Sequence, residues 1–150
     1  MFGDRKPFPF LQTEFNETQA QLSPDGRWVA YNSDESGKSE VYVRPFPAGD
    51  GKWQISTNGG VQARWRRDGK ELFYLARDSS KLMAVEVKAE KTFVASVPKA
   101  LFETRMNAPN FFYLYAASAN GQRFLLPSPV QETASAPLNV VVNWTAALHR

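Results

Sequence analysis

A chain of 150 residues is long enough for one domain with a buried core and too short for two comfortable ones. Hydrophobic residues make up 43% of the chain and aromatic residues 13%, which excludes a disordered protein. The net charge of +3 comes from scattered lysines and arginines and does not argue for a nucleic-acid partner, and the lack of cysteine excludes disulfides and thiolate chemistry.

No apolar run approaches the roughly 20 residues needed to span a bilayer, so no membrane span is expected within this chain. Residues 1–15 also lack the apolar central region of a secretory signal. We therefore expect either a cytoplasmic protein or a piece of a longer chain.

The first half of the chain predicts short strands separated by turns. Residues 6–15 (KPFPFLQTEF) predict a lone strand, whose prolines are tolerated at a sheet edge. A first group of four strands follows, at 18–22 (TQAQL), 28–31 (WVAY), 39–46 (SEVYVRPF) and 52–56 (KWQIS). The WVAY run is continuously apolar, which is typical of a strand buried on both faces.

The second half repeats this arrangement, and no helix is expected anywhere. A second group is predicted at 61–65 (VQARW), 72–75 (LFYL), 81–88 (KLMAVEVK) and within 92–104. A third group is predicted at 113–117 (YLYAA), 124–126 (FLL) and 138–144 (LNVVVNW).

A turn with glycine as its last residue leads into the second strand of every group. Asp25-Gly26 and Asp68-Gly69 are 43 residues apart (68 minus 25), and Asn120-Gly121 follows 52 residues later (120 minus 68). These residue types tolerate the positive φ angles of tight turns. Turn geometry explains their recurrence, so we assign them no ligand.

Groups of four short strands that repeat every 40 to 50 residues are the signature of propeller blades. We predict an all-β fold: one domain over 1–150, a β-propeller of four-stranded antiparallel blades. The expected boundaries are 16–57 for blade 1, 58–104 for blade 2 and 105–148 for blade 3. The lone strand at 6–15 would complete a third blade that has only three strands of its own.

Three blades are half of a six-bladed ring, and a half-ring would expose apolar faces. The expected partner is a second copy of this chain, with each lone strand at 6–15 exchanged into the other copy's third blade. A monomeric half-propeller or an irregular sandwich is the alternative.

Candidate catalytic and metal-binding residues are few, and we expect no enzyme, no cofactor and no metal. The single histidine, His149, is the penultimate residue, where a catalytic histidine would not be held rigidly. Residues 32–37 resemble a calcium loop only faintly, since Val43 stands where a bidentate acid is required. In the basic run 64–67, Trp65 has the same place before its turn as Leu22, where we expect a core position. We therefore expect a core tryptophan among solvated arginines.

Propeller architecture places a ligand site at one mouth of the central channel, among the loops that enter the innermost strands. These loops are predicted at 58–60 and 107–110. A protein or a small ligand is the expected partner there. The candidate ligand-binding residues lie in these loops or on the strands that follow them: Asn58, Gln62, Arg64, Asn107, Asn110 and Tyr113.

The stretch LSPDGRWVAYNSDESG at 22–37 resembles the SPDG-type repeat of Tol-system β-propellers and of the propeller halves of prolyl oligopeptidase-like proteins. The longer order of EVYVRPFP, KWQISTNGGVQARWRRDGKELFYLA, LMAVEV, FLL and NVVVNWTAAL is similar to the carboxy-terminal propeller of bacterial serine/threonine protein kinases. This resemblance implies a six-bladed sensor or scaffold domain. It also implies an extracytoplasmic location if a membrane-spanning kinase is attached, and a cytoplasmic one otherwise.

The chain itself carries no Gly-rich loop, His-Arg-Asp or Asp-Phe-Gly motif of a kinase and no Gly-x-Ser-x-Gly motif of a peptidase. The expected function is therefore a non-enzymatic binding or scaffold module, a protein- or ligand-sensing region of a bacterial signalling protein. Two alternatives remain open: a propeller that gates a hydrolase or peptidase, and a structural half-propeller that assembles with itself.

Overall fold

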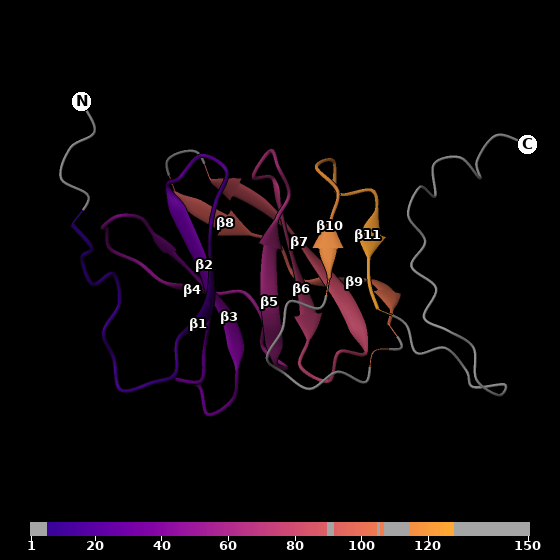
Figure 1. Ribbon diagram of the computed structural model, residues 1–150, viewed down its shortest axis with the longest axis horizontal. Coiled ribbons are helices and arrows are strands. Elements are labelled where there is room, and N and C mark those ends of the chain that lie inside the picture. Colours follow the sequence, from indigo (N-terminus) through magenta and orange to yellow (C-terminus); the bar gives the residue numbers. More distant parts are fainter. Residues whose placement is uncertain (1–5, 90–91, 105, 107–114, 128–150) are drawn as a thin grey trace, which may run out of the picture.

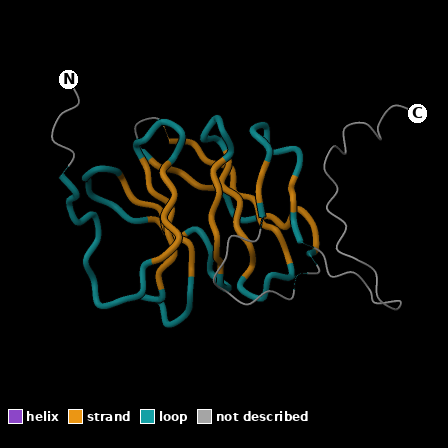
Figure 2. Tube along the Cα trace, in the orientation of Figure 1, coloured by secondary structure: helices purple, strands orange, loops and turns teal. Residues whose placement is uncertain are grey.

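The computed structural model describes residues 6–89, 92–104, 106 and 115–127. Strands are the regular elements of this part of the chain, which contains no helix (Figure 2). All strand pairs are antiparallel. The predicted all-β class is confirmed, whereas the described residues do not close into a ring and leave the number of blades untested.

The first sheet has the order β1-β2-β3-β4 and matches the first predicted group of strands. Its members are β1 (Thr18–Leu22), β2 (Trp28–Ser33), β3 (Glu40–Pro45) and β4 (Trp53–Gln54). All six residues of β2 are buried, as its continuous apolar run predicts. The second sheet covers one face of β2, and Phe10, Leu11 and Phe46 cover the other, so both faces of this strand are buried.

The second sheet has the order β5-β6-β7, and its outermost strand is divided into two pieces. Its members are β5 (Gly60–Trp65), β6 (Glu71–Ala76), β7 (Lys81–Ala89), β8 (Phe93–Ala95) and β9 (Lys99–Glu103). Both β8 and β9 pair with β7. Between them, the backbone nitrogen of Ser96 donates to the Glu86 oxygen at 2.9 Å, and the Ser96 hydroxyl accepts from the Glu86 nitrogen at 3.0 Å. The single outer strand predicted within 92–104 thus runs along β7 with an interruption.

The third unit is a hairpin of β10 (Ala116–Ala117) and β11 (Phe124–Leu125). It matches parts of the strands predicted at 113–117 and 124–126. The strand predicted at 138–144 and the loop at 107–110 lie outside the described residues, so the boundaries of a third blade stay a prediction.

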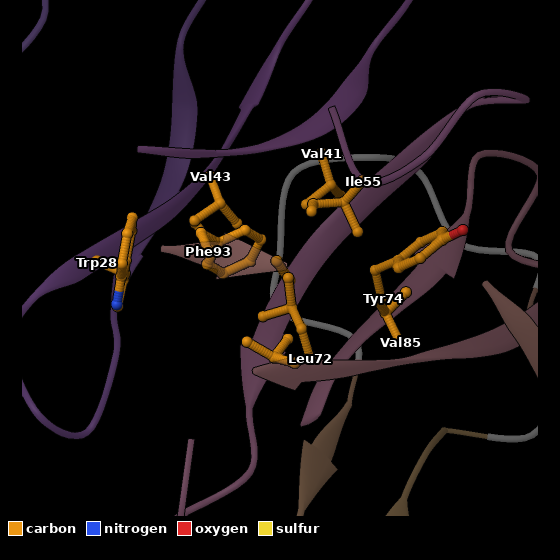
Figure 3. Close-up of a cluster of buried hydrophobic side chains, with 11 residues drawn as sticks. Trp28, Val41, Val43, Ile55, Leu72, Tyr74, Val85 and Phe93 are labelled. Atoms are coloured by element: carbon orange, nitrogen blue, oxygen red, sulfur yellow. The ribbon is translucent and has the colours of Figure 1, made fainter. Parts of the chain in front are cut away.

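The three units stack face to face, with the first sheet, the second sheet and the hairpin side by side in Figure 1. A core between the two sheets contains Trp28, Val41 and Val43 from the first and Leu72, Tyr74, Val85 and Phe93 from the second (Figure 3). A second core lies on the opposite face of the second sheet, where Phe73 and Leu75 pack with Tyr115 and Phe124. Because of this stacking, both faces of the second sheet are buried.

A cluster of four aromatic side chains, two from each sheet, holds the end of the second sheet against the first. The Phe93 ring lies 5.1 Å from that of Trp28, 5.3 Å from that of Trp53 and 6.4 Å from that of Trp65. Trp65 is partly buried against this core, as predicted, and its indole nitrogen donates to the Gln21 oxygen at 3.1 Å. The corresponding Leu22 is 53% exposed, so its predicted core position is wrong. Its shorter side chain is not among those that reach the core between the sheets.

Residues 6–15 form no strand in the single chain, and the predicted strand that completes a third blade stays a prediction. Instead, the rings of Phe8 and Phe10 lie 6.2 and 5.4 Å from that of Phe46. Together with Leu11, Phe10 packs on the face of the first sheet that points away from the second. Prolines at 7 and 9 remove two backbone donors, which disfavours pairing with a sheet edge. Exchange of this segment between two copies is untested.

Candidate functional site

The three predicted turns have the same backbone structure. The glycine of each turn has a φ between +69° and +71°, where only glycine is free of steric penalty. One hydrogen bond of 2.9 Å closes each turn, from Gly26 N to Ser23 O, from Gly69 N to Arg66 O and from Gly121 N to Ser118 O. The repeat predicted from the sequence is therefore present in the backbone of the structure. The turns lie along one edge of the stack, uppermost in Figure 1.

The acidic residues of these turns are occupied within the turns themselves. Asp25 accepts from the Ser23 hydroxyl at 2.6 Å and from Arg27 Nε at 2.7 Å. In the second turn, Arg66 takes the place of the serine and donates from Nε to Asp68 at 2.7 Å. This bond and a second one from the Lys70 backbone lower the pKa of Asp68 to about 2. These contacts agree with our expectation that the recurring residues serve turn geometry.

The first strand of each sheet, β1 or β5, contains a bulge that was not predicted from the sequence. Gln19 in β1 and Gln62 in β5 have φ angles of 55° and 59°, and 43 residues separate them (62 minus 19). Each lies where the pairing register shifts. A left-handed backbone conformation at a residue other than glycine costs about 1–2 kcal/mol. Because this conformation occurs at equivalent positions of both sheets, the bulge is a recurring structural element of the repeat within this chain.

A hydrogen-bond network holds the bulge of β5 between the sheets. The Gln62 backbone nitrogen donates to the Gln19 side chain at 2.9 Å and to the Asn32 side chain at 3.2 Å. The Asn32 amide nitrogen in turn donates to the Gly60 oxygen at 2.7 Å. Gln62, a predicted ligand-binding residue, is only 2% exposed and belongs to this packed interior.

A fully buried carboxylate fastens the predicted ligand loop at 58–60. Glu40 accepts from the Gly59 nitrogen at 2.8 Å and from the Ser56 hydroxyl, and its Oε1 lies 3.5 Å from the Lys38 ammonium. Burial, together with the Glu40 charge, raises the pKa of Tyr74 to about 12. The loop is therefore an anchored connection between the sheets.

The structure describes three of the six predicted ligand-binding residues, and these three differ in burial. Asn58 is exposed, Gln62 is buried and Arg64 is half-buried. The charge of Arg64 acts on the phenol of Tyr115, whose pKa burial nevertheless raises strongly. Asn107, Asn110 and Tyr113 lie outside the described residues, so a channel-mouth site stays a prediction.

A cleft of about 840 Å³ lies at the edge of the stack that carries the turns, between the first and second turns. It is lined by residues of both turns, by Trp28 and Trp65 beside them, and by residues 86–89 at the end of β7. Sequence reasoning missed this cleft. A basic residue soon after each turn, Arg27 and Lys70, and a tryptophan next to each turn were the available signals.

The described residues contain no group of three or more metal-ligating side chains and no helix long and apolar enough to cross a membrane. The geometry defines a class of protein: an all-β repeat of stacked antiparallel sheets that fits a β-propeller.

Comparison with known proteins adds one relative and no family. No protein-family model matches the chain. The chain is 25% identical over 126 residues to dipeptidyl aminopeptidase BI of Pseudoxanthomonas mexicana. The match covers 83% of this chain and 17% of that protein, so the chain spans about a sixth of its relative's length.

Proposed function

We propose that the chain forms successive blades of a β-propeller and works as a non-enzymatic binding module. The observation that carries this proposal is the repeat itself: the same turn and the same first-strand bulge occur in sheets that stack face to face. Stacked blades of this kind present loops at both edges, and loops on a rigid scaffold are where propellers bind other molecules.

The state of the acidic residues supports a role other than catalysis. Asp25 and Asp68 are each engaged by neighbouring donors of their own turn, and the buried Glu40 anchors a connection. A general acid or base needs a group that can reach a substrate proton. The carboxylates of Asp25, Asp68 and Glu40 stabilise the fold instead.

We further propose that two copies close a six-bladed ring when the chain is alone. At the end of the stack formed by the first sheet, Phe8, which stacks on Phe46 over the outer face, is 58% exposed. At the other end of the stack, Leu125 of the terminal hairpin is 74% exposed. Faces of this composition favour burial against another blade.

A gate for a hydrolase is the second candidate function. The similarity to a dipeptidyl aminopeptidase, along less than a fifth of that protein, favours it. In this form the blades would restrict access to a catalytic domain outside these residues. The sensor role in a signalling protein rests on the kinase-type resemblance of the sequence alone.

The non-enzymatic role is tested by adding the purified chain to a series of dipeptidyl 4-nitroanilides. We expect no release of 4-nitroaniline above that of buffer. Saturable hydrolysis that follows the chain through successive column fractions would overturn the proposal. Sequencing the gene on both sides of this region then distinguishes the hydrolase gate from the signalling sensor. An in-frame hydrolase domain favours the gate, and an in-frame kinase domain favours the sensor.

A further inference from the structure

The cleft between the first two turns has the dimensions and the rigid walls of a binding site. Its volume of about 840 Å³ lies within the roughly 300–1,000 Å³ of typical ligand pockets. One wall is the first turn, and another is the end of β7. The Arg27 guanidinium joins these walls, since its Nη2 donates to the Ala89 oxygen at 2.9 Å.

A buried donor without a partner lies in the lining of this cleft. Trp28 is 8% exposed, and its indole nitrogen has no hydrogen-bond partner among the residues that the structure describes. Trp28 stands at one end of the core cluster in Figure 3 and also lines the cleft. An unsatisfied buried N–H is costly, and its presence in a cleft points to an acceptor supplied by a ligand.

The charges of the cleft leave positive groups over. Asp25 is paired with Arg27, and both Asp68 and Glu71 are paired with Arg66. The fourth acid of the lining, Glu86, is paired with Lys99 outside the cleft. By contrast, no ion pair within the described part of the chain engages the other lining cations, which are Arg67, Lys70 and Lys88. All three are exposed and available to an anionic group.

We propose that this cleft binds an acidic peptide segment. A glutamate or aspartate carboxylate accepts from the Trp28 indole nitrogen, while Lys70 and Lys88 supply the complementary charge. The partly buried ring of Trp65 and the neighbouring Pro24 provide an apolar surface for an adjoining aliphatic side chain. Isolated carboxylates fit better than a polyphosphate, because the four acids of the lining would repel a dense negative charge.

This site goes beyond the proposed function and does not depend on ring closure, since every lining residue belongs to the first two sheets or their turns. It is tested by binding, whereas the proposed function is tested by hydrolysis and solution mass. Failure of one is therefore distinguishable from failure of the other.

The probe is a fluorescein-labelled peptide Glu-Leu-Glu-Leu-Glu, titrated with the full chain and followed by fluorescence anisotropy. We expect saturable binding that weakens as salt is raised, and at least tenfold weaker binding of the matched peptide Gln-Leu-Gln-Leu-Gln. Competition of free glutarate with the labelled peptide shows whether the cleft prefers a peptide carboxylate or a small dicarboxylate. Displacement by glutarate at concentrations close to those of the peptide would overturn the peptide assignment in favour of a small dicarboxylate.

Trp28→Phe removes the indole donor but keeps an aromatic ring, and we expect it to weaken peptide binding about tenfold. Trp53→Phe is the matched control, because Trp53 contacts the same aromatic core without lining the cleft, and its affinity should be unchanged. Lys88→Gln changes an exposed side chain and keeps the test decisive if Trp28→Phe does not fold. Wild-type affinity in both Trp28→Phe and Lys88→Gln, or the absence of saturable binding to the native chain, would refute the proposal.

Discussion

Glu40→Ala is expected to lower the free energy of unfolding by about 3 kcal/mol. Glu40 is fully buried and accepts hydrogen bonds from the Gly59 nitrogen and the Ser56 hydroxyl. Alanine leaves both donors buried without an acceptor, and it frees the connection that leads into β5. Urea unfolding followed by tryptophan fluorescence measures the change.

Glu86→Ala is the control for that substitution. The Glu86 side chain is 66% exposed and lies 3.8 Å from the Lys99 ammonium, which is also exposed. Such a pair contributes at most about 1 kcal/mol. Equal losses for the two variants would mean that Glu40 does not anchor the connection between the sheets.

Gly60→Ala is expected to cost about 2–3 kcal/mol through steric overlap. A Cβ atom at this position would lie 2.5 Å from the Ser56 hydroxyl oxygen, 2.7 Å from its Cβ and 3.0 Å from a ring carbon of Tyr74. These neighbours belong to the packed interface of the two sheets, so they have little freedom to withdraw.

Gly37→Ala separates steric overlap from backbone strain. Gly37 has a φ of +87° and no atom within 4 Å of an added Cβ, so alanine there costs about 1 kcal/mol of strain alone. Thermal unfolding of both variants should rank Gly60→Ala as the more destabilised. The opposite order would show that Ser56 and Tyr74 do not pack as closely against Gly60 as these distances indicate.

The strands and turns of this fold could be predicted because their signals are local. An Asp-Gly or Asn-Gly pair before an apolar run determines a turn without reference to the rest of the chain, and all three predicted turns are present. Continuous burial of β2 likewise follows from its own composition. The period of the repeat and the spacing of its strands then predicted the order of the strands along the chain.

Other features depend on contacts between distant residues, and local patterns do not encode them. The bulge at Gln62 exists because its nitrogen meets the side chains of Gln19 and Asn32, which belong to the neighbouring sheet. The interruption of the outer strand and the position of residues 6–15 also depend on which faces lie nearby.

The candidate site illustrates the same limit. The predicted ligand residues were chosen for their place in a propeller, and the structure shows Gln62 buried in the interior. The cleft was missed because its walls come from residues far apart in sequence, such as Arg27 and Ala89, which are 62 positions apart. Only the folded chain brings its tryptophans and lysines together.

The most direct test of the blade assignment is the mass of the chain in solution, measured by light scattering during size-exclusion chromatography and repeated after dilution. Stacked blades that need a neighbour at each end predict twice 16.9 kDa, unchanged on dilution. A stable, folded monomer of 16.9 kDa would contradict closure of a six-bladed ring by two copies.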